Sequence, residues 1–157
     1  MAPIAVRNFS HVSVHVADMA RAKRFYVDLL GLGVLFDVAL EGKGLEAVTG
    51  RPGAKGRMVG CLVPGGGMIE LVEGALRRGA REPIDGGDDS LIFSLCVADL
   101  DDAYRALGAA GAELLQEPAE VAGVRMFFVR DPDGRRIELI EFPGEATRAS
   151  ELHGYRG

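Results

Sequence analysis

Polar and apolar residues alternate along residues 9–16, where the regular part of the chain begins. The apolar positions are Val12, Val14 and Val16, and the polar positions are His11, Ser13 and His15. A period of two is typical of a β-strand with one buried face. We therefore predict a strand here, with the histidines and the serine on the face away from the apolar core.

The spacing of apolar residues lengthens after residue 18. Asp18 stands where the N-cap of a helix belongs, and Gly31 stands where a C-terminal glycine belongs. The apolar residues that recur between them at helical spacing are Ala22, Phe25, Tyr26 and Leu29. These features predict a helix near 19–30, directly after the first strand.

Three further strands complete this first module. They are predicted near 33–40, 57–63 and 68–73. A glycine-rich turn at 64–67 joins the last two, whereas the glycine-punctuated stretch 41–56 is predicted to be a loop. A polar segment at 74–89 is predicted to connect this module to the next part of the chain.

The same succession of elements then begins again. Asp99 is a second N-cap and Gly111 a second C-terminal glycine, around a helix predicted over 100–110. The sequence Asp-Pro-Asp-Gly at 131–134 is a strong turn signal. The predicted strands lie near 90–97, 112–116, 121–130 and 135–142. The tail, 143–157, has no apolar period and is expected to be loose or to dock on a partner.

The repetition is also visible in residue identities. A shift of 81 positions places six residues of 13–24 on identical residues, and a shift of 68 places eight residues of 57–73 on identical residues without a gap. One such module cannot cover its own sheet on both sides, so two must pack together within the chain or across a dimer. We predict one α+β domain of two tandem βαβββ modules, 9–73 and 90–142, whose strands form a curved mixed sheet around a shared, mostly apolar cavity.

Composition and charge limit the function classes. A chain of 157 residues, 48% hydrophobic and 26% charged, suits one domain with an apolar core. The formal net charge of −5 argues against nucleic-acid binding, which needs a basic face. No stretch approaches the roughly 20 apolar residues of a membrane span, and the opening residues lack the pattern of a secretory signal. We expect a cytoplasmic protein with no membrane partner, whose Cys61 and Cys96 are reduced, half-buried thiols.

Candidate metal ligands fall on one predicted face of the strands. Glu70 and Glu138 each stand between apolar residues, and their side chains therefore point away from the helices, to the same side as His11. These three converge if a pseudo-twofold axis relates the modules. One imidazole nitrogen and two carboxylate oxygens suit a divalent metal with open positions. Taken singly, each could instead be a structural hydrogen-bonding or salt-bridge residue.

Two ends of the chain resemble a known family. The run 11–18, followed by 25–32, resembles the opening of the vicinal oxygen chelate superfamily, and 128–141 resembles its usual ending. This superfamily includes glyoxalase I, methylmalonyl-CoA epimerase, the bleomycin and fosfomycin resistance proteins and the extradiol dioxygenases. The resemblance covers roughly residues 9–142 and implies the glyoxalase-like fold. It does not imply one reaction, because the family spans isomerases, lyases, oxygenases and metal-free binders.

The resemblance also implies a ligand set. The family's first-strand histidine falls on His11, its fourth-strand ligand on Glu70 and its last-strand glutamate on Glu138. The remaining position, usually a histidine, falls on Ile92, which cannot bind a metal. The resemblance thus implies three protein ligands for one divalent ion (Mn, Fe, Ni, Co or Zn), or a site that has lost its metal.

Further residues are candidates for substrate contact. His15 lies about 13 Å along the strand from His11, so it cannot share the same ion and is expected to contact substrate or move a proton. Ser94 shares the predicted concave face. Arg125 could bind an anionic substrate, although a salt bridge with a carboxylate is the alternative.

Two classes of function follow. The first is a metal-dependent isomerase, lyase or epimerase acting on a small oxygenated metabolite, in which Glu138, or its repeat counterpart Glu70, also removes a proton. The alternatives are a metal-free, antibiotic-like binding protein and an extradiol-type dioxygenase. Ile92 weighs against the dioxygenase, whose relatives use a second histidine. We also expect a homodimer, because exposed module edges leave surface to cover.

Overall fold

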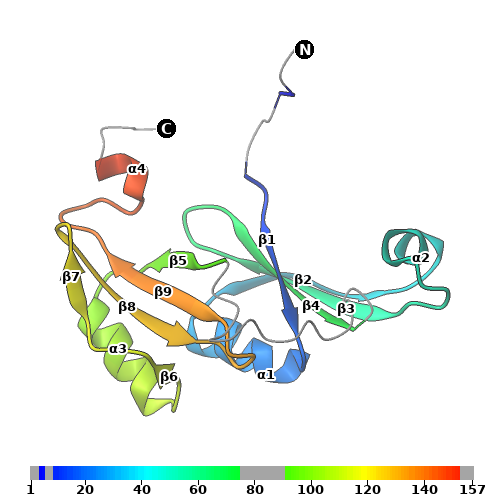
Figure 1. Ribbon diagram of the computed structural model, residues 1–157, viewed down its shortest axis with the longest axis horizontal. Coiled ribbons are helices and arrows are strands. Elements are labelled where there is room, and N and C mark those ends of the chain that lie inside the picture. Colours follow the sequence, from blue (N-terminus) through cyan, green and yellow to red (C-terminus); the bar gives the residue numbers. More distant parts are fainter. Residues whose placement is uncertain (1–3, 6–8, 75–90, 153–157) are drawn as a thin grey trace. The chain divides into compact units, whose positions relative to one another are not determined.

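The computed structural model describes residues 4–5, 9–74 and 91–152 (Figure 1). The predicted connector 74–89 therefore lies outside the described residues, apart from Gly74. Contacts along the chain divide it into two compact units, Met1–Arg81 and Glu82–Gly157. Each unit contains one of the two predicted modules.

The first unit is built on a four-stranded sheet. Its elements are β1 (Val12–Val16), α1 (Met19–Lys23), the π-helical η1 (Arg24–Leu29), β2 (Gly33–Leu40), α2 (Lys43–Thr49), β3 (Gly56–Leu62) and β4 (Met68–Gly74). The strand order is β1-β4-β3-β2, with β1 parallel to β4 and the other pairs antiparallel. This is the predicted βαβββ module, with α2 inserted between its second and third strands.

The second unit repeats this topology. Its elements are β5 (Phe93–Cys96), α3 (Leu100–Ala109), β6 (Glu113–Leu114), β7 (Ala119–Val121), β8 (Val124–Arg130), β9 (Arg136–Glu141) and α4 (Ala149–Leu152). The order β5-β9-β8-β6 matches that of the first sheet, again with the first pair parallel, and β7 adds to β8. The α+β fold of tandem modules is confirmed, and its strands form two mixed sheets, one in each unit. The cavity shared by the modules stays a prediction.

Each helix begins at the aspartate predicted to cap it. Asp18 has an extended backbone (φ −141°) and accepts a hydrogen bond from the Arg21 backbone N–H at 2.8 Å. Asp99 repeats both features (φ −142°, 2.8 Å to the Asp102 backbone N–H). These bonds satisfy N–H groups that a helix start otherwise leaves without a partner in the helix. The N-cap predictions are confirmed.

A glutamate at the end of each sheet holds the same helix start. The Met19 backbone N–H donates to Glu73 Oε1 at 2.7 Å, and the Leu100 backbone N–H donates to Glu141 Oε2 at 2.9 Å. Both glutamates stand at equivalent positions of the repeat, 68 residues apart. One carboxylate therefore joins each sheet to the start of its helix.

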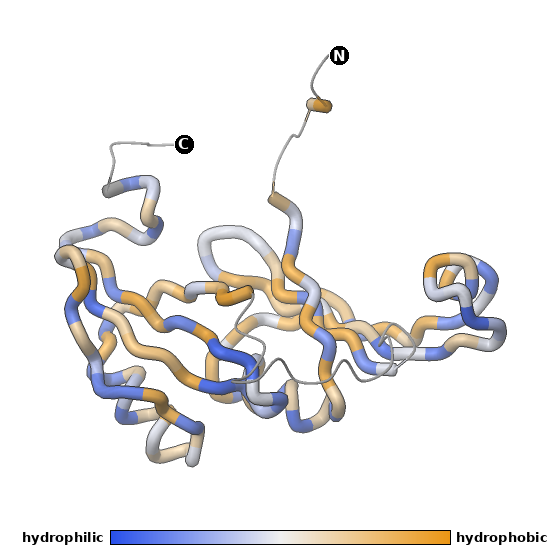
Figure 2. Tube along the Cα trace, in the orientation of Figure 1, coloured by the Kyte–Doolittle hydropathy of each residue, from blue (hydrophilic) through white to orange (hydrophobic). Residues whose placement is uncertain are grey.

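The buried core lies between each helix and its sheet. The buried side chains of the first unit include Val14, Val16, Met19, Ala22, Tyr26, Val59, Cys61, Ile69 and Leu71. Those of the second unit include Leu100, Leu107, Phe127, Val129, Ile137 and Leu139. Along β1 and the first part of β9 hydrophobic and hydrophilic residues alternate, as Figure 2 shows, and Val14, Val16, Ile137 and Leu139 are buried. Ile140 follows Leu139 and is also buried, so the alternation ends there. Among the described helices, none has the length and apolar character of a membrane crossing.

Several predicted boundaries were wrong. The stretch 41–56, predicted as a loop, contains α2, which starts after Gly42 and ends at Gly50 in the left-handed conformation (φ 65°). Residues 121–130, predicted as one strand, are broken after Val121 by a turn in which Ala122 (φ 53°) and Gly123 (φ 80°) both have positive φ. The tail also contains the short helix α4.

The predicted helix 19–30 is correct in extent, but it is not α-helical throughout. The Leu30 backbone N–H donates to the Phe25 carbonyl at 2.9 Å, five residues earlier, so the second half is a π-helix. Gly31 then ends the segment in the left-handed conformation (φ 72°), as Gly111 does after α3 (φ 77°).

Candidate functional site

The face of each sheet opposite its helix is called here the open face. In the first unit this face carries Ser13 and Glu70, since Val14, Ile69 and Leu71 are buried on the helix side. In the second unit the equivalent residues are Ser94 and Glu138. The predicted assignment of these polar side chains to the face away from the helices is confirmed within each unit.

A serine holds the glutamate on both open faces. Ser13 is in register with Glu70 across the β1–β4 pair and donates from Oγ to Glu70 Oε1 at 2.8 Å. Ser94 is in register with Glu138 across the β5–β9 pair and donates from Oγ to Glu138 Oε2. One carboxylate oxygen is occupied in each case, which orients the carboxylate and leaves its other oxygen for a second contact.

His11 lies beside Glu70 at the start of β1. Its Nε2 is 3.9 Å from Glu70 Oε2, the oxygen that Ser13 does not contact, and its Nδ1 is 2.8 Å from Ser10 Oγ. Two ligands about 2.1 Å from one ion, with an angle of about 90–110° between them, are about 3.0–3.4 Å apart. A shift of less than about 1 Å would therefore let both atoms bind one divalent ion. The donor set, an imidazole and a hydrogen-bonded carboxylate, suits such an ion.

Within the described residues, neither unit has a full ligand set by itself. In each unit the described residues bring together no group of three His, Cys, Asp or Glu side chains that could hold a metal. The third predicted ligand, Glu138, belongs to the second unit, so the three-ligand site stays a prediction. Ile92 directly precedes β5 and is 37% exposed, at the position that corresponds to His11 before β1.

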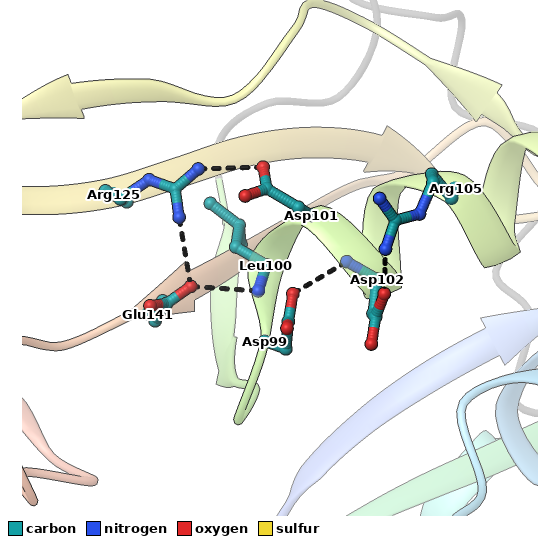
Figure 3. A network of polar contacts seen from close by, with 7 residues as sticks. All are labelled: Asp99, Leu100, Asp101, Asp102, Arg105, Arg125 and Glu141. Carbon is teal, nitrogen blue, oxygen red and sulfur yellow. Dashed lines mark hydrogen bonds and ion pairs between the residues drawn. The ribbon is translucent and has the colours of Figure 1, made fainter.

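Arg125 lies on the face opposite Glu138. Its guanidinium donates to Asp101 Oδ1 at 2.8 Å and contacts Glu141 Oε2 at 3.4 Å (Figure 3). The hydrogen bond that Arg125 donates to Asp101 raises the pKa of Arg125 above its ordinary value. The structure thus places Arg125 in the salt bridge that the sequence left as the alternative, linking β8 to the start of α3. Its predicted contact with substrate stays a prediction.

The repeat counterpart of Arg125 is also on the helix side. Arg57 makes a bidentate pair with Asp37 (2.8 Å for both contacts), and Lys23 contacts the same carboxylate at 2.9 Å. Hydrogen bonds from Arg57 and Lys23 hold the pKa of Asp37 well below its usual range. At this position both modules therefore place the arginine in a cluster of ion pairs that includes a charged residue of the helix.

The structure also describes the remaining predicted residues, His15 and the two cysteines. His15 is exposed at the far end of β1, four residues from His11. Both cysteines are free, but they are not equally half-buried: Cys61 is buried, so the pKa of its thiol is raised, whereas Cys96 is exposed on β5.

An aromatic ring lies next to each glutamate, and neither ring was predicted from the sequence. In the first unit Gly60 is in register with Glu70, and the Phe36 ring and Met68 lie over it; a Cβ at Gly60 would be 2.5 Å from Phe36 Cε1 and 2.8 Å from Met68 Sδ. In the second unit Phe128 itself is in register with Glu138. The Arg136 guanidinium lies 4.5 Å from the centroid of the Phe128 ring. The shift of 68 positions, which aligns Phe128 with Gly60 opposite Glu70, could have indicated Phe128, whereas Phe36 reaches this place through packing.

Comparisons with known proteins agree with this architecture. The model of the Glyoxalase/Bleomycin resistance protein/Dioxygenase superfamily matches residues 8–139. A glyoxalase family protein from Bacillus cereus superposes with a TM-score of 0.78 at 23% identity, covering 92% of this chain and 99% of that one. No curated protein matches the sequence.

Two further solved structures have similar coverage. An antibiotic binding protein from Streptomyces sp. CB03234 superposes with a TM-score of 0.61 at 25% identity, covering 88% of this chain and 98% of its own. A glyoxylase/bleomycin resistance protein/dioxygenase domain from Frankia sp. EAN1pec superposes with a TM-score of 0.63 at 23% identity, covering 88% and 99%.

Proposed function

Because the chain belongs to the glyoxalase/bleomycin resistance protein/dioxygenase superfamily, we propose that it is a divalent-metal-dependent isomerase, lyase or epimerase of a small oxygenated metabolite. The observation that supports this most is the pairing of His11 with Glu70 on the open face of the first unit. The metal (Mn, Fe, Ni, Co or Zn) would be held by His11 and Glu70, with Glu138 as the third ligand.

The residues of this chain have different roles in the proposed reaction. A bound divalent ion supplies positive charge to neighbouring oxygens of a substrate. Ser13 and Ser94 orient the two carboxylates by donating to one oxygen of each. Glu138 accepts a proton from a carbon next to a substrate carbonyl, a step that needs a base close to that carbon. Because Ile92 cannot bind a metal, one coordination position of the ion would have no protein ligand and could be taken by a substrate oxygen.

Metal affinity tests the ligand assignment. We expect Glu70→Ala and His11→Ala each to weaken Co²⁺ binding by at least about tenfold, because each removes a ligand side chain entirely. Titration of apo protein with Co²⁺, followed by absorbance and calorimetry, measures this. His15→Ala is the matched control, since it removes an exposed histidine from the same strand and should change the affinity less than about twofold. Equal affinity in all three variants would contradict the assignment.

The position of Ile92 gives a gain-of-function prediction. Ile92→His places an imidazole where the repeat has His11, so we expect Zn²⁺ affinity to rise by roughly tenfold if that side chain faces the ion. Competitive titration against a chromogenic chelator measures the change. Unchanged or weaker binding would mean that residue 92 does not face the metal.

A metal-free binding protein is the second candidate. Phe36 and Met68 give the first open face an apolar surface beside Glu70, and one of the similar structures is an antibiotic binding protein. This function requires tight binding of an unmodified ligand by metal-depleted protein, which calorimetry with such protein would detect.

The homodimer also stays a prediction, and a particle of 16.7 kDa in light scattering would contradict it.

A further inference from the structure

The second unit carries arginines on both faces of one sheet. Arg125 belongs to the helix side, where Asp101 and Glu141 hold it (Figure 3). Arg136 belongs to the open face: it precedes the buried Ile137 on β9 and is two residues from Glu138. Residues two apart on a strand are about 6.6–6.8 Å apart and share a face. Arg136, rather than Arg125, is therefore the arginine beside the predicted catalytic glutamate.

The ring of Phe128 supports Arg136 in this position. Phe128 is directly opposite Glu138 across the β8–β9 pair, and the Arg136 guanidinium lies 4.5 Å from the centroid of its ring. A guanidinium stacked on an aromatic ring is held by the ring's negative face and directs its N–H donors outward in the guanidinium plane. That geometry suits bidentate recognition of a carboxylate or phosphate.

A second positive charge lies across the same strand pair. Arg130 is in register with Arg136, and its own guanidinium contacts Glu113 Oε1 at 3.2 Å and the Gly134 carbonyl at 2.7 Å. Like charges directly opposite one another on neighbouring strands are unfavourable by themselves. The contact between Arg130 and Glu113 already reduces this repulsion within the protein.

The repeat indicates that packing alone does not require the charge. The first unit also has a ring beside its glutamate, where Phe36 lies over Gly60, and there the residue next to the ring is Met68. Met68 corresponds to Arg136 in the repeat. Because a thioether occupies this position in one module, packing beside the ring does not by itself account for the guanidinium in the other.

We propose that Arg136, stacked on Phe128, binds an anionic group of the substrate, a carboxylate or a phosphate, and holds the substrate next to Glu138. This inference rests on the proposed function, because it names the class of substrate for that site. It makes the substrate an anionic oxygenated metabolite, and it moves the role predicted for Arg125 to the other face of the sheet.

Binding of small probes tests the proposal. Pyruvate and inorganic phosphate serve as anionic probes and hydroxyacetone as the neutral probe, each titrated into the full chain with chemical shifts followed by NMR. In Arg136→Met, which copies the residue of the first module, we expect the Kd for pyruvate or phosphate to rise at least tenfold, with hydroxyacetone changed less than twofold. Arg105→Met removes an exposed arginine of α3 and is the matched control, with less than twofold change.

The outcomes separate the alternatives. Anion affinity that is unchanged in Arg136→Met but lost in Arg125→Met would overturn the proposal in favour of Arg125. Absence of saturable binding of both anions by the wild type would also overturn it. Co²⁺ titration of the same samples separates this result from the metal assignment: anion binding that depends on Arg136 in a protein without metal affinity supports the proposal and refutes the metal-dependent function.

Discussion

Glu138→Gln is expected to lower the rate of proton exchange at a substrate carbon by roughly 10²–10⁴-fold while most of the metal stays bound. Glutamine has the shape of glutamate and can still accept the hydrogen bond from Ser94, but it cannot take a proton. Removal of a proton next to a carbonyl at neutral pH needs such a base and a positive charge near the carbonyl oxygen.

Deuterium exchange measures this step without knowledge of the product. Metal-loaded protein in deuterated water would be incubated with 2-hydroxy ketones, hemithioacetals and acyl thioesters, and label incorporation followed by mass spectrometry. Glu120→Gln, an exposed glutamate of β7, is the control and should exchange at the wild-type rate. Undiminished exchange in Glu138→Gln would refute the assignment. Tight binding of one compound by the wild type, with no exchange into any, would favour the binding protein instead.

Asp131→Ala is expected to lower the free energy of unfolding by about 2–4 kcal/mol. The Asp131 carboxylate is buried in the turn between β8 and β9 and accepts from the backbone N–H groups of Asp133 (2.9 Å) and Arg135 (2.8 Å). The Arg135 guanidinium also contacts it at 2.8 Å. Alanine would remove all three contacts and leave part-buried donors without this acceptor.

Urea unfolding at pH 7 measures the loss as a lower midpoint with an unchanged slope. Asp131→Asn keeps an acceptor oxygen without the charge and should fall between wild type and alanine. Asp28→Ala removes the same side chain from an exposed position of η1 and should stay within about 0.5 kcal/mol of wild type. A midpoint for Asp131→Ala equal to that of Asp28→Ala would show that the buried carboxylate does not stabilise the turn.

Local signals in the sequence predicted most of the fold. Asp18 and Asp99 act as N-caps, and the alternation along β1 and the first halves of β4 and β9 separates buried apolar residues from more exposed polar ones as predicted. The same alternation assigned Glu70 and Glu138 to the face away from the helices. These features were predictable because each depends on a residue type at a fixed spacing rather than on distant contacts.

The features that were missed depend on packing. The strand β8 has aromatic residues on both faces, Phe127 buried under α3 and Phe128 on the open face, so the sequence pattern did not show which face Arg125 shares. Arg125 in fact shares the side of Phe127. The helix α2 was missed because its glycines resemble those of a loop, although Gly42 and Gly50 flank the helix at its two ends.

The π-helix of the first unit coincides with a difference in length between the helical segments of the two repeats. Asp18 and Asp99 are 81 residues apart, whereas Gly31 and Gly111, which end the two helical segments, are 80 residues apart. The first module therefore has one more residue between cap and terminal glycine. A π-helical turn takes up one additional residue without ending the helix. The repeats thus diverged by an insertion or deletion within a helix, and the five-residue hydrogen bond from Leu30 to Phe25 is where that residue is accommodated.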